Sequence, residues 1–77
     1  MKTKVLLFGI LADEAKRSMI EIENVTDTNV LLTEMKKINS VFSNSKYVVA
    51  VNKKIVSANQ TLLENDEVAL LPPFAGG

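Results

Sequence analysis

The sequence predicts a small α+β domain in which a mixed sheet is covered on one face by one main helix. Three observations support this prediction. The most apolar runs stand near the two ends of the chain, at residues 5–10 and 68–71. Between them, one stretch has the spacing of an amphipathic helix, and shorter β-rich runs flank it. The chain has 77 residues, which suits a single domain, residues 1–77, with a modest core.

Two strands are predicted before the helix. Residues 5–10 form a nearly continuous apolar run, typical of a central strand that is covered on both faces. Residues 11–17 mix charged residues with alanine, and we expect them to form a connecting loop. Residues 18–23 alternate toward their end, with Ile20 and Ile22 pointing inward, which predicts a half-buried edge strand.

The helix is predicted from a capping segment followed by apolar residues at helical spacing. Asp27 or Thr28 is expected to accept hydrogen bonds from the first free backbone N–H groups. The apolar stripe that would face the sheet consists of Leu31, Met35, Ile38 and Phe42. The helix is expected to end near Asn39, because residues 40–46 are mostly polar.

Three further strands are predicted after the helix. Residues 47–51 are β-branched and aromatic, and residues 54–56 return from them through a tight turn at Asn52-Lys53. Residues 68–71 form the last strand, which Pro72-Pro73 ends because proline has no N–H to donate. The first and last strands are the most apolar, so they should be neighbours at the sheet centre. This order of elements is the β-grasp, or ubiquitin-like, arrangement.

Composition argues against several function classes. Nine basic and nine acidic residues balance, so the charge gives no reason to expect binding to nucleic acid or to a membrane. The absence of Cys and His removes thiol nucleophiles, His acid–base catalysis and the usual zinc ligands, and we expect no bound metal or cofactor. We expect a cytoplasmic protein, because no apolar run is long enough for a bilayer and no signal cleavage site appears.

The distinctive chemical feature is the tail of residues 72–77, Pro-Pro-Phe-Ala-Gly-Gly. Without a Cβ, Gly76 and Gly77 fit a slot too narrow for other residues. The prolines favour an extended tail, which reaches at most about 20 Å from the last strand. The Gly77 carboxylate must be activated before another atom can replace its oxygen, and the chain has no phosphate-binding glycine loop. We therefore predict a carrier that one partner charges and another discharges.

Several motifs together carry a family resemblance: Val51-Asn52, Val56-Ser57, Leu62, Asp66-Glu67-Val68-Ala69 and Pro72 to Gly77, with Lys4 to Phe8 fitting a first strand. At these residues the sequence resembles the small subunit of molybdopterin synthase, over essentially the whole chain but most specifically in its last third. The chain departs from the family at two places. Asn65 stands where the family usually has glycine, and we expect it to adopt the same left-handed turn. Residues 11–14 replace an arginine-glutamate pair that is common in the family's first loop.

The resemblance implies a function and a set of partners. An E1-like adenylating enzyme is expected to activate the Gly77 carboxylate with MgATP, and a sulfur donor to convert it to a thiocarboxylate. The tail would then insert into the molybdopterin synthase large subunit, which holds the catalytic residues, and sulfur would pass to cyclic pyranopterin monophosphate to form molybdopterin. The small subunit itself is expected to be non-catalytic, in a heterotetramer of two small and two large subunits.

The predicted site residues fall into two groups. Gly77 carries the reacting group, and Gly76 and Ala75 let the tail enter the partner. The expected partner interface consists of Phe74, Pro73, Pro72, Leu71 and Ala69. On the last strand, Ala69 and Leu71 share the face opposite to the helix, and either a partner or the chain's own loops would cover it. Phe8, in contrast, is expected to lie in the core.

Three other functions are compatible with the same features. A sulfur carrier for thiazole synthesis shares the fold and the Gly-Gly chemistry, but Pro72-Pro73 favours the molybdopterin pattern. A ubiquitin-like modifier would be joined to lysines of other proteins through the same terminus. A binding module would carry an inert tail, because glycines at a chain end can have no role.

Overall fold

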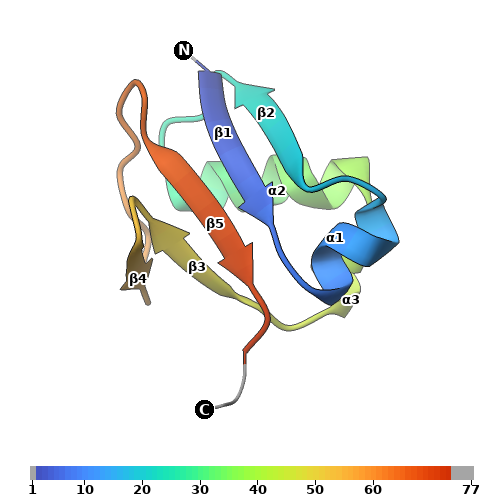
Figure 1. Cartoon of the computed structure of the whole chain (residues 1–77). Helices are drawn as coiled ribbons and strands as arrows, with labels where there is room; N and C mark the ends of the chain where they lie inside the picture. The colour runs from blue at the N-terminus through green and yellow to red at the C-terminus, as the bar shows by residue number, and fades with distance from the viewer. Residues whose placement is uncertain (1, 74–77) are drawn as a thin grey trace.

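The computed structural model describes residues 2–73, so the tail positions Phe74, Ala75, Gly76 and Gly77 lie outside the described residues. The elements run in the order β1 (Lys2–Leu7), α1 (Ile10–Ala15), β2 (Met19–Glu23), α2 (Thr28–Ile38), α3 (Val41–Asn44), β3 (Val48–Val51), β4 (Lys54–Val56) and β5 (Glu67–Leu71). Figure 1 shows α2 crossing behind the sheet, with α1 and α3 near one end. None of the helices within residues 2–73 has the length and apolar character that a bilayer crossing requires.

The five strands form one mixed sheet in the order β2-β1-β5-β3-β4. Strands β1 and β5 are parallel, and the other three neighbouring pairs are antiparallel. The first strand therefore pairs with the last inside the sheet, as the sequence predicts. The α+β class and the β-grasp arrangement are confirmed.

One face of the sheet and α2 enclose the core. The inward side chains of the central strands are fully or nearly fully buried, among them Val5, Leu7, Val68 and Leu70. From α2, Leu31 and Met35 pack against them, and both are completely buried. The predicted stripe is wrong at Ile38, which is 51% exposed because it lies in the last turn of α2, where the helix extends past the core.

The start of α2 is capped as predicted. The Val30 N–H donates to the Asp27 side chain at 2.9 Å, so Asp27 is the capping residue. Thr28 lies inside the helix and is buried, and its hydroxyl contacts the loop at Asn59 and Gln60. These contacts attach the first turn of α2 to the segment that leads toward β5.

Two short helices replace predicted irregular segments. Residues 11–17 do not form a loop, because residues 10–15 form α1, whose completely buried Leu11 fixes it to the core. Residues 40–46 contain α3, which follows a break at Asn39. Phe42 is buried, but it belongs to α3 and not to the α2 stripe.

Strand β1 begins earlier than predicted and is covered on one face only. Thr3, Val5 and Leu7 point to the core, whereas Lys2, Lys4 and Leu6 alternate with them and point away. The prediction that Phe8 lies in the core is wrong, since its side chain is 43% exposed. Position 8 is two residues after Leu6, so it continues the alternation in which every second side chain points away from the core. The sequence does not reveal this alternation at residues 5–8, because the inward and the outward side chains are both apolar.

The predicted left-handed turns are confirmed. Asn52 and Lys53 have φ values of 50° and 72°, and they join β3 to β4. Asn65 has a φ of 72° just before β5, as expected for a residue that replaces glycine. The Asn52 side chain also donates to Asp66 at 2.9 Å and accepts from the Glu67 N–H at 3.0 Å, which joins the two turns.

Candidate functional site

The sheet face opposite to α2 carries a continuous row of apolar residues across all five strands. Strand pairing places Met19 beside Leu6, Leu6 beside Ala69, Ala69 beside Ala50, and Ala50 beside Ile55. We call these five residues the apolar row. Its two ends are the most exposed members, at 40% for Met19 and 68% for Ile55. A face of this kind is typical of a protein–protein contact.

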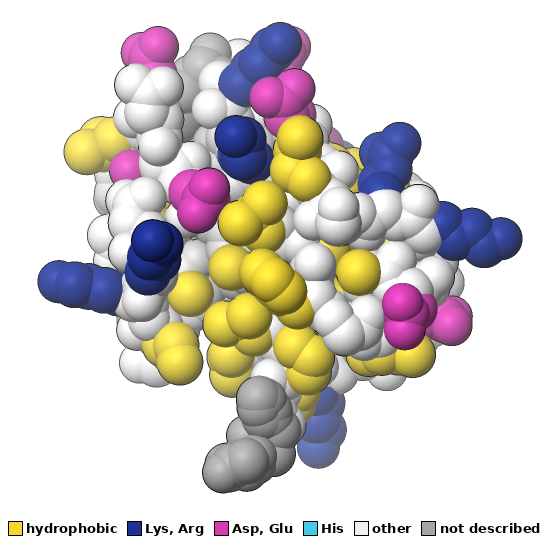
Figure 2. Space-filling model, in the orientation of Figure 1, with side chains coloured by type: hydrophobic (Ala, Val, Ile, Leu, Met, Phe, Trp, Pro, Cys, Tyr) yellow, Lys and Arg dark blue, Asp and Glu magenta, His cyan; other side chains and the backbone are white. Residues whose placement is uncertain are grey.

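The apolar surface continues from this row toward the C-terminal end of β5. Leu71, which pairs with Val48, is half-buried and lies one step beyond the row. Phe8, which is 43% exposed, follows β1, and Pro72 and Pro73 follow β5, half-buried and exposed respectively. In Figure 2, hydrophobic side chains gather in one patch that extends down the face as far as the end of the described chain.

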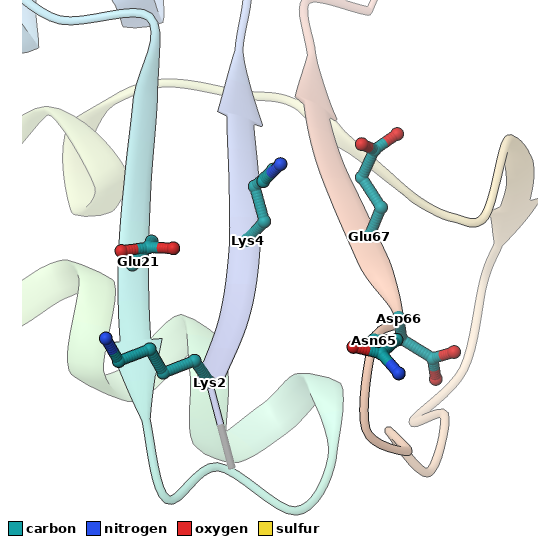
Figure 3. A pocket seen from close by; sticks show the side chains of 6 residues that line it. All are labelled: Lys2, Lys4, Glu21, Asn65, Asp66 and Glu67. Atoms are coloured by element: carbon teal, nitrogen blue, oxygen red, sulfur yellow. The ribbon is translucent and has the colours of Figure 1, made fainter.

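The opposite end of the same face is charged. Strand pairing places Lys4 between Glu21 of β2 and Glu67 of β5. These side chains and those of Lys2, Asn65 and Asp66 line a shallow hollow, shown in Figure 3. We call this group the charged end. Its place at the start of β5 puts it at the far end of the strand from Pro72.

The polar groups at the charged end are arranged for contact with solvent or a partner. Within residues 2–73, the lysines and glutamates of the charged end form no ion pair with one another. The ion pair in this part of the chain lies on α2, where Lys37 contacts Glu34 at 3.1 Å. Asp66 accepts from the Leu63 N–H at 2.8 Å and from Asn52, and these two hydrogen bonds lower the pKa of its carboxyl. Asp66 therefore stabilises the turn before β5, and it lies at the opposite end of this strand from the tail.

The structure brings together the predicted interface residues that it describes. Ala69 is the centre of the apolar row, and Leu71, Pro72 and Pro73 lead from it to the end of the described chain. Phe74 and the three tail residues after it lie outside the described residues, so their predicted roles stay predictions. Within residues 2–73 the two ends of the row, Met19 and Ile55, are exposed, whereas Ala50 near its centre is buried, with 3% of its surface exposed.

Sequence reasoning missed most of the apolar row. Met19, Leu6, Ala50 and Ile55 join Ala69 only through strand pairing, and pairing registers cannot be read from one sequence. One signal was available: if Val5 and Leu7 face the core, then Leu6 and Phe8 face away. No group of three or more residues that could bind a metal is present within the described part, and the chain has neither Cys nor His.

Comparison with known proteins places this geometry in a family. The ThiS family model matches residues 5–77. A molybdopterin synthase sulfur carrier subunit from Mycobacterium tuberculosis is 34% identical over 82 residues, which cover 100% of this chain and 99% of that protein.

Two solved structures have the same fold. A putative molybdopterin converting factor, subunit 1, from Pyrococcus furiosus has a TM-score of 0.85 and 27% identity, covering 96% of this chain and 99% of the other. The complex of subunits 1 and 2 of the molybdopterin-converting factor from Helicobacter pylori contains a chain with a TM-score of 0.75 and 24% identity, with both chains covered completely. This chain belongs to the ThiS family, as a homologue of the molybdopterin synthase sulfur carrier subunit.

Proposed function

We propose that this chain carries sulfur on its Gly77 carboxylate and delivers it to a pterin precursor inside a molybdopterin synthase. The observation that carries the proposal is the apolar row together with its extension to Pro72. A partner bound on this surface would lie directly beside the point where residues 74–77 begin. The full-length match to a sulfur carrier subunit supports the same conclusion.

The proposed loading takes place in two balanced steps on a separate activating enzyme. A carboxylate oxygen of Gly77 attacks the α-phosphorus of MgATP and displaces pyrophosphate, which gives an acyl-adenylate. Hydrosulfide then attacks the acyl carbon and displaces AMP, so that a thiocarboxylate forms and one proton is released. No redox change is needed when the donor supplies sulfur at this oxidation level.

The proposed delivery step needs a second partner. The thiocarboxylate sulfur attacks an oxygen-bearing carbon of cyclic pyranopterin monophosphate, and the carbon–oxygen bond breaks as the oxygen leaves as water or remains on the phosphate when it is the ester oxygen. Water then cleaves the acyl carbon–sulfur bond and leaves the sulfur on the pterin. The oxygen of that water restores the Gly77 carboxylate, and two charged carriers supply the two sulfur atoms of molybdopterin. The catalytic groups for this step would come from a large subunit, since this chain lacks His and Cys.

We propose that the large subunit binds the apolar row. The relative from Helicobacter pylori is described as a complex of subunit 1 with subunit 2 of the molybdopterin-converting factor. A row that spans five strands with few charges suits the buried centre of such an interface, and the charged end suits its rim.

The proposal is tested by loading and transfer with purified proteins. The chain is incubated with its activating enzyme, MgATP and sulfide, and intact-mass measurement is expected to detect the replacement of one oxygen by one sulfur. Addition of the large subunit and cyclic pyranopterin monophosphate should restore the original mass and produce molybdopterin. A chain that lacks Gly77 serves as the control, and it should bind the large subunit but produce no molybdopterin.

Other acceptors would contradict the proposal. Sulfur transfer to a thiazole precursor and not to the pterin would assign the chain to the other sulfur-carrier pathway. Attachment of the loaded chain to lysines of other proteins would assign it to the modifiers. Undiminished cofactor synthesis by the chain without Gly77 would rule out any role of the terminus.

A further inference from the structure

Gly9 lies directly beneath Pro72, the first residue after β5. A Cβ added to Gly9 would lie 2.6 Å from Cγ of Pro72 and 3.6 Å from its Cδ. The first distance is far shorter than any ordinary carbon–carbon contact, which lies near 3.5–4.0 Å. Figure 1 shows the connection from β1 to α1 beside the end of β5, where this contact occurs. Only glycine allows the proline ring to approach the backbone this closely.

The backbone at Gly9, which contacts the proline ring, is fixed by its conformation and by hydrogen bonds. Gly9 has a φ of 60° and a ψ of −136°, a combination that glycine adopts readily and other residues avoid. Its carbonyl accepts from the Asp13 N–H at 3.1 Å, and the Phe8 carbonyl accepts from the Leu11 N–H at 3.2 Å. The completely buried side chain of Leu11 fixes this first turn of α1 to the core.

Pro72 is positioned by strand β5, which it directly follows. Leu71, the residue before it, still pairs with Val48 in the sheet. The pyrrolidine ring fixes the φ of Pro72, and the side chain is half-buried. The strand sets where Pro72 begins, and the contact with Gly9 sets how its ring is placed. Together they determine the position and direction of the backbone at Pro73.

We propose that Gly9 is a positioning residue for the reactive terminus, acting through Pro72. This inference rests on the proposed function, in which the tail enters the active site of a large subunit docked on the apolar row. The interface would fix the body of the chain, and the contact between Gly9 and Pro72 would aim the backbone that follows. A Cβ at position 9 would displace the Pro72 ring, at the edge of the expected interface, and misdirect the tail, while the five residues of the apolar row keep their places.

The test separates docking from delivery. The thiocarboxylate form is prepared by sulfide cleavage of an intein fusion, so the activating enzyme is not needed. The dissociation constant for the large subunit is measured, and sulfur transfer is followed in single turnovers at saturating large subunit. For Gly9→Ala, the dissociation constant should change less than about threefold, whereas the transfer rate should fall by about tenfold to a hundredfold.

Two further variants distinguish positioning from a loss of stability. Asn24→Ala places alanine at another left-handed position, with a φ of 64°, beyond the end of β2 that pairs with Lys2. It tests alanine at a positive-φ position far from Pro72, and it should transfer sulfur at the wild-type rate. Pro72→Ala removes the ring atom that the new Cβ would meet. It should slow transfer by itself, yet it should raise the rate of Gly9→Ala when the two are combined.

Each outcome decides a specific point. Failure of the wild-type thiocarboxylate to transfer sulfur would overturn the proposed function and this inference with it. Equal transfer rates in wild type and Gly9→Ala would overturn the positioning role alone. If Gly9→Ala does not fold, Pro72→Ala tests the positioning role instead. An unchanged transfer rate in Pro72→Ala would show that the contact between the proline ring and Gly9 has no effect on sulfur transfer.

Discussion

Thr3 carries a buried hydroxyl that has no hydrogen-bond partner within residues 2–73. Thr28 is buried too, but its hydroxyl donates to Asn59 and accepts from the Gln60 N–H at 3.0 Å. Burying a polar group without a partner costs free energy, so Thr3→Val should stabilise the chain by about 1 kcal/mol. Thr28→Val should destabilise it by about 1–3 kcal/mol, because the same exchange breaks existing bonds.

Urea unfolding of the two threonine variants checks this prediction. Both exchanges replace a hydroxyl by a methyl group of nearly the same size, so the pair isolates hydrogen bonding from packing. A loss of stability in Thr3→Val as large as that in Thr28→Val would mean that the Thr3 hydroxyl does have a partner in solution.

Asp66 gives the folded chain a specific sensitivity to acid. Hydrogen bonds from the Leu63 N–H and from the Asn52 side chain lower the pKa of its carboxyl below the ordinary value of 3.8. The pKa of the Asp66 carboxyl is therefore lower in the folded chain than in the unfolded chain. The stabilisation that the charged carboxylate gives to the fold is complete above the pKa of the unfolded chain, and it is lost as pH falls through the pKa of the folded chain. Asp66→Asn should therefore flatten the decline of stability below pH 3.8.

The measurement is the urea midpoint of wild type and Asp66→Asn at a series of pH values. The wild type should be the more stable of the two at neutral pH, and the two curves should converge in acid. Parallel curves would mean that the two hydrogen bonds do not favour the charged carboxylate.

At the level of elements, α1 depends on a single buried side chain. Leu11 is completely buried, whereas its neighbour Ile10 is 50% exposed. Truncation of Leu11 to alanine should cost about 2–5 kcal/mol, as for other large-to-small changes in a core. Ile10→Ala, which removes a similar number of carbon atoms, should change stability by no more than about 0.5 kcal/mol. Denaturant unfolding of both variants compares them, and equal losses would contradict the assignment of Leu11 as the anchor.

The elements that the sequence predicted well are those with a repeated local signal. Helix α2 repeats its buried side chains over 11 residues and has Asp27 at its start, and the turn at Asn52-Lys53 needs residues that tolerate a left-handed backbone. Helix α1 has 6 residues and one buried side chain, so no stripe exists to be recognised. Helix α3 has 4 residues, far fewer than the roughly 11–18 residues over which a helical period can be recognised.

For the whole molecule, the sequence allowed a prediction of a reactive terminus, which stays a prediction because residues 74–77 lie outside the described part, and it predicted only the β5 portion of the surface beside it. Gly-Gly after two prolines is a local feature that can be read directly. The apolar row, in contrast, exists only because four strand pairings align residues that are as far apart in the sequence as Leu6 and Ala69. The contact of Gly9 with Pro72 is also non-local, and the sequence offered only an isolated glycine.

The division of the open face into an apolar half and a charged end predicts how the chain binds its large partner. Ala69 lies at the centre of the apolar row, where truncations and charges affect binding most. Ala69→Arg should weaken binding to the large subunit by at least about a hundredfold, since an arginine there would be buried without a partner. Ile38→Arg is the control, because it also places arginine at an exposed apolar position but on α2, behind the sheet.

Calorimetric titration of wild type and both variants with the large subunit provides the measurement. Ile38→Arg should bind like the wild type, and wild-type affinity should change little with salt, because the chain has a net charge of zero and its apolar row lies apart from the charged end. Equal weakening by both variants would place the partner elsewhere. A steep loss of affinity with salt would instead assign the main binding energy to Lys4, Glu21 and Glu67.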